Sequence, residues 1–76
     1  MNQYKIYINT YISPEIIERI LRIIRHRGFR ICYMKVNSVL KIGNILIEII
    51  VESKKPIDFL IKQLSKLIDV FDIKII

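Results

Sequence analysis

The order of hydrophobic and polar residues along the chain predicts four strands. In residues 4–11 and 45–52 the side chains fall into two sets at alternate positions, and one set is isoleucine-rich, which is the period of a strand with one buried face. The expected buried residues of these two strands are Ile6, Ile8 and Thr10, and then Ile45, Ile47, Ile49 and Val51. The last strand is expected over residues 70–76, with Phe71, Ile73 and Ile75 on one face.

The remaining strand is expected to begin at Phe29, with Ile31, Met34 and Val36 as its inward residues. The step from Ile31 to Met34 interrupts the alternation, so a β-bulge is predicted near residues 32–33. Residues 37–44 then predict a hairpin loop, because they include Asn37, Ser38, Gly43 and Asn44, which are common in turns.

The stretch between the first two strands predicts a helix. Ser13 is a candidate N-cap, since its hydroxyl can accept a bond from a free backbone N–H, and Pro14 suits the first helical position. The expected buried stripe is Ile17, Ile20, Leu21 and Ile24. Arg25, His26 and Arg27 fill the last turn, and Gly28 can adopt the left-handed conformation that follows a helix C-terminus.

A second helix is expected to begin at Pro56, and the element order is therefore βαββαβ. The buried stripe of this helix is predicted to be Ile57, Leu60, Ile61, Leu64, Leu67 and Ile68. The order is that of the ferredoxin-like α+β fold, in which right-handed crossovers place both helices on one face of a four-stranded antiparallel sheet. The 76 residues form a single domain, 1–76.

Composition indicates that this domain works with a partner. The chain is 53% hydrophobic and has one cysteine, so a small core without disulfides is expected to bury surface against another protein. The net charge of +6 permits nucleic acid, an acidic membrane or an acidic protein without choosing among them. The first ten residues lack the pattern of a signal peptide, and no apolar run is long enough to span a membrane, so a cytoplasmic location is expected.

Residues that could carry chemistry are few. His26 and Cys32 are the only residues of their types, whereas a metal site needs about four ligands. His26 is better explained as a partner of the helix dipole, and Cys32 as a small buried hydrophobic residue. Glu15 and Glu18 suit the first turn of the helix. We therefore expect no catalytic residue, no metal ligand and no cofactor on this chain.

The run Arg19, Arg22, Arg25, Arg27 and Arg30 is the strongest indication of nucleic-acid binding. A solvated helix face with a basic end explains the same pattern more simply. RNA-binding domains of this topology stack bases on aromatic residues of the first and third strands. Residues 45–52 contain no aromatic residue, and Glu48 on the open face repels phosphate. Nucleic acid is therefore not the expected partner.

Two sets of residues carry a resemblance to a known family. The set in the first half of the chain is Pro14, Glu18, Arg19, Leu21, Arg22, the run Arg25–Phe29, Cys32 and Met34. The set in the second half is Asn44, Ile45, Ile47, Glu48, Asp58, Leu60, Gln63, Leu64, Lys66, Leu67, Asp69 and Val70. Through them essentially the whole chain resembles the ACT domain of acetolactate (acetohydroxyacid) synthase small subunits, in particular the short small subunit of the valine-insensitive isozyme II. Arg-His-Arg-Gly-Phe is the most specific part of the resemblance, and a structural role is expected for Arg27, Gly28, Ile31, Met34 and Val36.

The resemblance implies a regulatory or activating small subunit that is not itself an enzyme. Members of the family bind a large catalytic subunit that uses thiamine diphosphate, magnesium and FAD to condense pyruvate with pyruvate or 2-oxobutyrate. This is a step in the biosynthesis of valine, leucine and isoleucine. The resemblance also implies a homodimer in which two sheets pair edge to edge, within a heterotetramer.

The chain departs from valine-sensitive relatives where the first strand meets the first helix. Those relatives carry Asn-x-x-Gly, and the carboxylate of the effector meets backbone N–H groups there. The corresponding residues here are Ile12, Ser13, Pro14 and Glu15. Ile12 cannot form a side-chain hydrogen bond, Pro14 lacks an N–H, and Glu15 adds bulk and negative charge. Valine inhibition through this loop is therefore not expected.

Two surfaces are candidates for contact with the catalytic subunit. One is the uncovered sheet face, where Tyr7, Tyr11, Leu46 and Ile50 are expected beside Lys5 and Glu48, and the other is the helix face of Arg19, Arg22 and Arg25. Two other functions stay open. A free-standing amino-acid sensor predicts a stabilising ligand, and a small basic nucleic-acid-binding domain predicts strongly salt-dependent binding.

Overall fold

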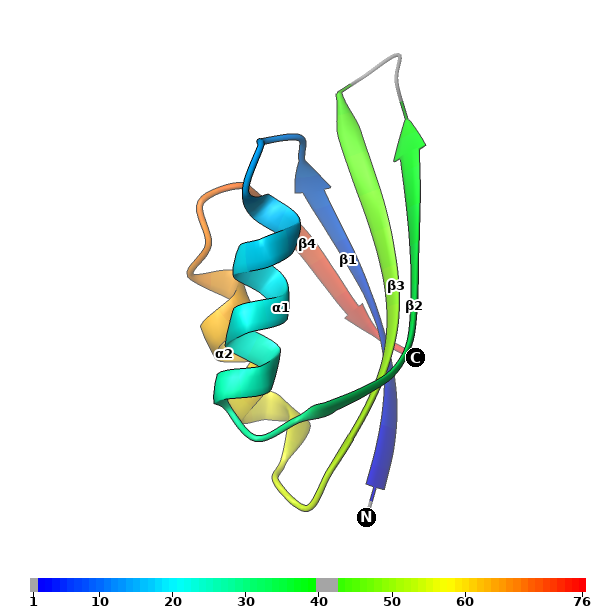
Figure 1. Cartoon of the computed structure of the whole chain (residues 1–76), viewed down its shortest axis with the longest axis vertical. Helices are drawn as coiled ribbons and strands as arrows, with labels where there is room; N and C mark the ends of the chain where they lie inside the picture. Colours follow the sequence, from blue (N-terminus) through cyan, green and yellow to red (C-terminus); the bar gives the residue numbers. More distant parts are fainter. Residues whose placement is uncertain (1, 40–42) are drawn as a thin grey trace.

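A computed structural model describes residues 2–39 and 43–76. Its elements are β1 (Asn2–Tyr11), α1 (Ile16–His26), β2 (Arg30–Val39), β3 (Asn44–Ser53), α2 (Ile57–Ser65) and β4 (Val70–Ile75). Figure 1 shows α1 and α2 next to each other on one face of the sheet, while the opposite face is left uncovered. The predicted βαββαβ order and two-layer fold are confirmed. Neither helix in these ranges is long and apolar enough to cross a membrane.

The four strands follow the order β2-β3-β1-β4, and every neighbouring pair is antiparallel. The central strands β1 and β3 are in register, so that Ile6 lies opposite Ile49 and Ile8 lies opposite Ile47. β2 and β4 form the two edges of the sheet. Figure 1 shows that the paired ends of β2 and β3 continue past the helices.

The core lies between the inner faces of the central strands and the two helices. The strands contribute Ile6, Ile8, Thr10, Ile45, Ile47, Ile49 and Val51, all buried as predicted. The helices and the loop after α1 contribute Ile16, Ile20, Ile24, Phe29, Leu60 and Leu64. Thr10 is the polar member of the strand set, and its hydroxyl donates a hydrogen bond to the carbonyl of Asp69 at 2.9 Å. A buried hydroxyl needs such a partner, since burial without one is costly.

The predicted start of the first helix is wrong. α1 begins at Ile16 with Glu15 at its N-cap, and Pro14 and Glu15 form a turn before it. The Ser13 hydroxyl does not cap the helix but donates to the carboxylate of Asp69, with 3.1 Å between the oxygens. The side chain expected to cap α1 is therefore bonded to a residue far along the chain.

The buried stripe of α1 is also shifted from the prediction. Ile16, Ile20 and Ile24 are buried at a spacing of four residues, and Ile17 packs partly against them. The predicted stripe missed Ile16 and included Leu21, which lies at the surface of the helix instead.

The end of α1 follows the prediction closely. Gly28 has a φ of 83°, which is the left-handed conformation expected of it. Its N–H donates to the carbonyl of Arg25, and the N–H of Phe29 donates to the carbonyl of Ile24, both at 3.1 Å. These two bonds form a Schellman motif, in which the buried side chains of Phe29 and Ile24 also lie in one core.

The predicted bulge in β2 is confirmed. Ile31 lies opposite Val51 and Tyr33 lies opposite Ile50, so Cys32 is the extra residue. Cys32 is exposed, and its prediction as a buried residue is wrong, because the bulge leaves it without a partner across the sheet.

Met34 and Val36 face the helix side of the sheet, opposite buried residues of β3, as predicted. Each is nevertheless 37% exposed, because β2 is an edge strand. Asn37 and Ser38 belong to β2 and not to a loop, and residues 40–42 of the predicted hairpin loop lie outside the described residues.

Two predictions near the C-terminus are wrong. Asn9 lies opposite Asp72 and Thr10 lies opposite Val70, so Phe71 is the extra residue of a second bulge and does not share the inner face with Ile73. The second helix ends at Ser65, and Ile68, which was expected in its buried stripe, is 89% exposed.

Candidate interaction surfaces

Polar groups of the loop between β1 and α1 form hydrogen bonds and an ion pair with other residues of the chain. The N–H of Ile12 donates to the carbonyl of Gly43 at 3.0 Å, and Ser13 is bonded to Asp69. The Glu15 carboxylate forms an ion pair with Arg19, with 3.2 Å between nitrogen and oxygen. The backbone enters α1 with the N–H of Ile16 directed at the Ser13 carbonyl, at 3.4 Å.

This arrangement is poorly suited to a carboxylate ligand. Helix N-termini bind anions through free N–H groups and the positive end of the helix dipole. Here Pro14 has no N–H to offer, and Glu15 places its own negative charge at the start of α1. Both features are consistent with the expected lack of effector binding, which stays a prediction.

The open face of the sheet has a charged centre. Lys74, Tyr7, Glu48 and Lys35 occupy neighbouring positions on β4, β1, β3 and β2. The Lys5 Nζ atom lies 3.0 Å from Glu48 Oε1 and also 5.6 Å from the centre of the Tyr7 ring. The Glu48 side chain is only 19% exposed, so this ion pair is partly shielded from water.

The ion pair shifts both titrations toward the charged forms. The hydrogen bond from Lys5 lowers the pKa of Glu48, with the Tyr7 hydroxyl and the charges of Lys5 and Lys35 acting in the same direction against partial burial. The hydrogen bond and the charge of Glu48 raise the pKa of Lys5. Glu48 is therefore compensated inside the sheet and does not need a cation from a partner.

Apolar residues surround this centre. The predicted members Tyr7, Leu46 and Ile50 are half-buried and Tyr11 is exposed, all on the open face. Sequence reasoning missed two exposed aromatic residues there, Tyr33 and Phe71. Tyr33 lies opposite Ile50, and the Phe71 ring centre lies 4.7 Å from that of Tyr11. The bulge predicted at residues 32–33 could have placed Tyr33 on this face, whereas the bulge at Phe71 had no sequence signal.

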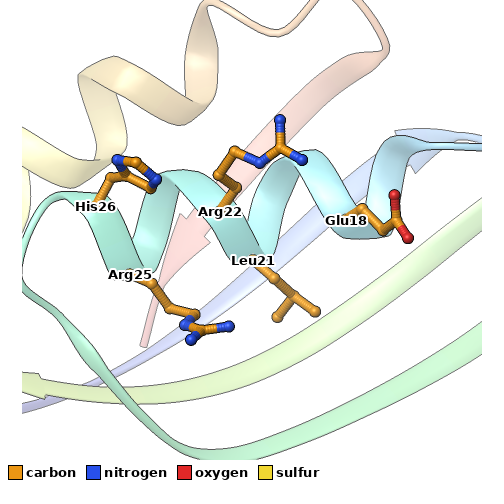
Figure 2. Close-up of a pocket in the computed structure, with 5 residues that line it drawn as sticks. All are labelled: Glu18, Leu21, Arg22, Arg25 and His26. Carbon is orange, nitrogen blue, oxygen red and sulfur yellow. The ribbon is translucent and has the colours of Figure 1, made fainter.

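The arginines of the second predicted surface, on α1, differ in their ion pairing. Arg19 is paired with Glu15, whereas Arg22 and Arg25 are exposed and form no ion pair with any described residue. A shallow hollow on α1 is lined by Glu18, Leu21, Arg22, Arg25 and His26. Figure 2 shows Leu21 and Arg25 pointing to one side of the helix, and Arg22 and His26 to the other.

A second hollow adjoins the first at the end of α1. It is lined by Arg25, Gly28, Phe29, Arg30 and Ile31, so that Arg25 borders both hollows. Arg30 forms an ion pair with Glu52 at 3.2 Å. Phe29 and Ile31 give this hollow an apolar lining beside two guanidinium groups.

The turn between β3 and α2 is hydrogen-bonded to the end of α1. The Ser53 hydroxyl donates to the carbonyl of Gly28, and the Lys55 ammonium donates to the carbonyl of Arg27, both at 3.1 Å. Arg27 in turn donates to the side-chain oxygen of Gln63 at 3.2 Å, and its guanidinium lies 5.6 Å from the centre of the Phe59 ring. The sequence run of arginines did not indicate that Lys55 joins them.

The described part of the chain contains no group of three or more His, Cys, Asp or Glu side chains that could hold a metal ion. His26 and Cys32 are both exposed and belong to different elements. The exposed apolar and basic groups described above lie on the open sheet face and around the end of α1.

Comparison with known proteins adds family relationships to this geometry. Residues 12–73 match the family model described as ACT domain. The small subunits of acetolactate synthase isozyme 2 from Escherichia coli K12 and Shigella flexneri are each 40% identical over 75 residues, which cover 99% of this chain and 86% of the relative.

Two solved structures have the same fold at lower identity. The small subunit of acetolactate synthase from Thermotoga maritima superposes with a TM-score of 0.86 at 21% identity, over 99% of this chain and 47% of that one. The ACT domain of GTP pyrophosphokinase from Chlorobium tepidum superposes with a TM-score of 0.83 at 18% identity, over 97% of this chain and 96% of that one. At these identities the two structures support the fold alone.

Proposed function

Because this chain belongs to the ACT domain family and to the small subunits of acetolactate synthase, we propose that it activates a large catalytic subunit of that enzyme. The observation that carries the proposal is the 40% identity to isozyme 2 small subunits, which extends over 99% of the chain. The large subunit would hold thiamine diphosphate, magnesium and FAD and condense pyruvate with pyruvate or 2-oxobutyrate. This chain would supply contact surface and no reacting group.

A homodimer within a heterotetramer is part of the proposal, with the β2 edge as the surface shared by two copies. β2 has 10 residues, against 6 in β4, so it is the longer free edge. An exposed strand edge is a template for pairing with another chain. Pairing through β2 would also give Met34 and Val36, each 37% exposed, a neighbour on the helix side. Two sheets of four strands would then become one of eight.

Valine is not proposed as an effector of this subunit. The position that corresponds to the effector loop holds Ile12, Ser13, Pro14 and Glu15, and the Glu15 carboxylate is engaged by Arg19 at 3.2 Å. A bound amino acid would bring its own carboxylate against this charge. The proposed role is therefore activation without feedback inhibition through this loop.

Contact with the large subunit is proposed through one of two surfaces. The first is the open face with Tyr7, Tyr11, Leu46, Glu48 and Ile50, and the second is the part of α1 that carries Arg19, Arg22 and Arg25. Aromatic residues and arginines are common anchors of protein interfaces, so both have suitable chemistry.

The direct test of the subunit role is complex formation. The large acetolactate synthase subunit of the same organism is mixed with this chain and analysed by sedimentation velocity. We expect this 9.1 kDa chain to sediment with the large subunit, and to sediment as a dimer when alone. A chain that stays separate at micromolar concentrations of both proteins would contradict the proposed function.

A further inference from the structure

Basic residues gather at the end of the molecule where α1 finishes. We define the basic end as Arg22, Arg25, Arg27, Arg30, Lys54 and Lys55, which are all exposed. Figure 1 shows the C-terminal end of α1 beside the turn between β3 and α2, and the hydrogen bond from Lys55 to the Arg27 carbonyl joins these two segments. Two distant parts of the sequence therefore form one positively charged surface.

The charges of the basic end are only partly balanced within the chain. Arg30 is paired with Glu52, whereas Arg27 donates to the neutral side-chain amide of Gln63. Arg22 and Arg25 form no ion pair in residues 2–39 and 43–76, although Glu18 lines the same hollow. On the open sheet face Glu48 and Lys5 neutralise each other at 3.0 Å, and the basic residues beside them, Lys35 and Lys74, are lysines and not arginines.

The unpaired guanidinium groups of the basic end restrict the kind of partner that it can accept. Covering an unpaired guanidinium with an apolar or basic surface is unfavourable, because the charge loses water and gains no counter-charge. A surface that brings carboxylates to Arg22 and Arg25 makes charge-assisted hydrogen bonds instead. Arginine is suited to such contacts, since its guanidinium is weakly hydrated and binds a carboxylate with two parallel bonds.

The hollows on either side of Arg25 indicate a protein and not a nucleic acid. They are lined by Leu21 on one side and by Phe29 and Ile31 on the other, next to the guanidinium groups. Phosphate groups make no use of an apolar lining, and Phe29 is buried, so it cannot stack on a base. Carboxylates framed by apolar side chains fit this combination.

We propose that the basic end, centred on Arg22 and Arg25, is the surface through which this chain binds an acidic surface of the large catalytic subunit. The inference rests on the proposed function. Of its two candidate surfaces it selects the one on α1, without Arg19 and extended to the other residues of the basic end. Association is then favoured by opposite charges, and it weakens as ionic strength rises.

The test compares charge reversals of equal size at two places. The variant R22E/R25E changes the basic end, and K62E/K66E makes the same change in charge at exposed residues in the last turn of α2 and just after it. Affinity for the large subunit is measured by titration calorimetry at low and at physiological ionic strength, with circular dichroism to check folding. We expect R22E/R25E to bind at least about tenfold more weakly with a reduced salt dependence, and K62E/K66E to bind within about twofold of the original chain.

The milder variant R22Q/R25Q keeps the test valid if charge reversal disturbs the fold. It is expected to lie between the original chain and R22E/R25E in affinity. Unchanged affinity of both arginine variants, while the original chain still binds and activates, overturns the inference and leaves the proposed function intact. Binding of a single-stranded RNA oligonucleotide more tightly than the large subunit overturns the inference as well. Failure of the original chain to bind the large subunit overturns both.

Discussion

The ammonium of Lys5 on β1 lies 3.0 Å from the carboxylate of Glu48 on β3, at the centre of the open face of the sheet. The hydrogen bond and charge of Lys5 lower the pKa of Glu48 below its ordinary value of 4.5. The folded state therefore binds this proton less readily than the unfolded state. The resulting stability is fully present above pH 4.5 and is lost as the pH falls through the lowered folded-state pKa.

We predict that E48Q lowers the stability of the domain at neutral pH, because it removes this ion pair. The difference between the two proteins should shrink as the pH falls below 4.5, where Glu48 of the original chain takes up its proton. Urea denaturation midpoints across this range measure the effect. A difference that stays constant down to the acid-unfolding range would show that Lys5 and Glu48 do not interact in solution.

Burial in the core gives a second prediction, about the free energy of unfolding. Ile20 is buried between α1 and the sheet, so I20A should lower the free energy of unfolding by about 2–5 kcal/mol. Ile68 is 89% exposed, so I68A should change it by less than about 0.5 kcal/mol. Chemical denaturation of the two variants side by side makes the comparison. Equal losses would mean that the segment after α2 packs on the core after all.

Residues with strict local patterns could be predicted from the sequence. The inner faces of β1 and β3 follow from the two-residue period of their isoleucines, and Gly28 follows from the need for a left-handed residue after a helix. The bulge at Cys32 could be predicted because it interrupts an otherwise regular alternation.

The remaining differences depend on contacts that no short window of sequence contains. Ser13 is a residue type that commonly caps helices, but its hydroxyl is bonded to Asp69. Phe71 leaves the inner face because of a bulge against β1, and its ring instead lies beside Tyr11. The basic end could not be predicted either, since it depends on Lys55 being folded against the Arg27 carbonyl.

The end of α1 can be tested with its glycine. Alanine at Gly28, with its φ of 83°, must adopt the left-handed conformation, at a cost of about 1–2 kcal/mol. G43A is the matched control, because Gly43 has a φ of 68° and no atom of the described residues lies within 4 Å of the added Cβ. A Cβ at Gly28 would lie 3.0 Å from the Lys55 ammonium and displace it from the Arg27 carbonyl.

We therefore expect G28A to lower the free energy of unfolding more than G43A does. In a K55A background this additional loss should disappear. Thermal or chemical unfolding of the four variants G28A, G43A, K55A and G28A/K55A measures the loss in each case. An additional loss that persists without the Lys55 side chain would show that the contact with Lys55 is not its cause.

The loop before α1 predicts the response to valine. With Glu15 at the N-cap and Pro14 beside it, valine at millimolar concentration should produce no binding heat and no rise in melting temperature. A valine-sensitive small subunit of the same family serves as the positive control. Micromolar binding of valine to this chain would contradict the prediction.

The central claim is that a chain without reacting groups of its own acts on a larger subunit that has them. Its most direct test is the rate of acetolactate formation from pyruvate by the purified large subunit, measured while this chain is titrated in. The rate should rise with added chain and level off when the large subunit is saturated. A rate that is the same with and without this chain would contradict the claim.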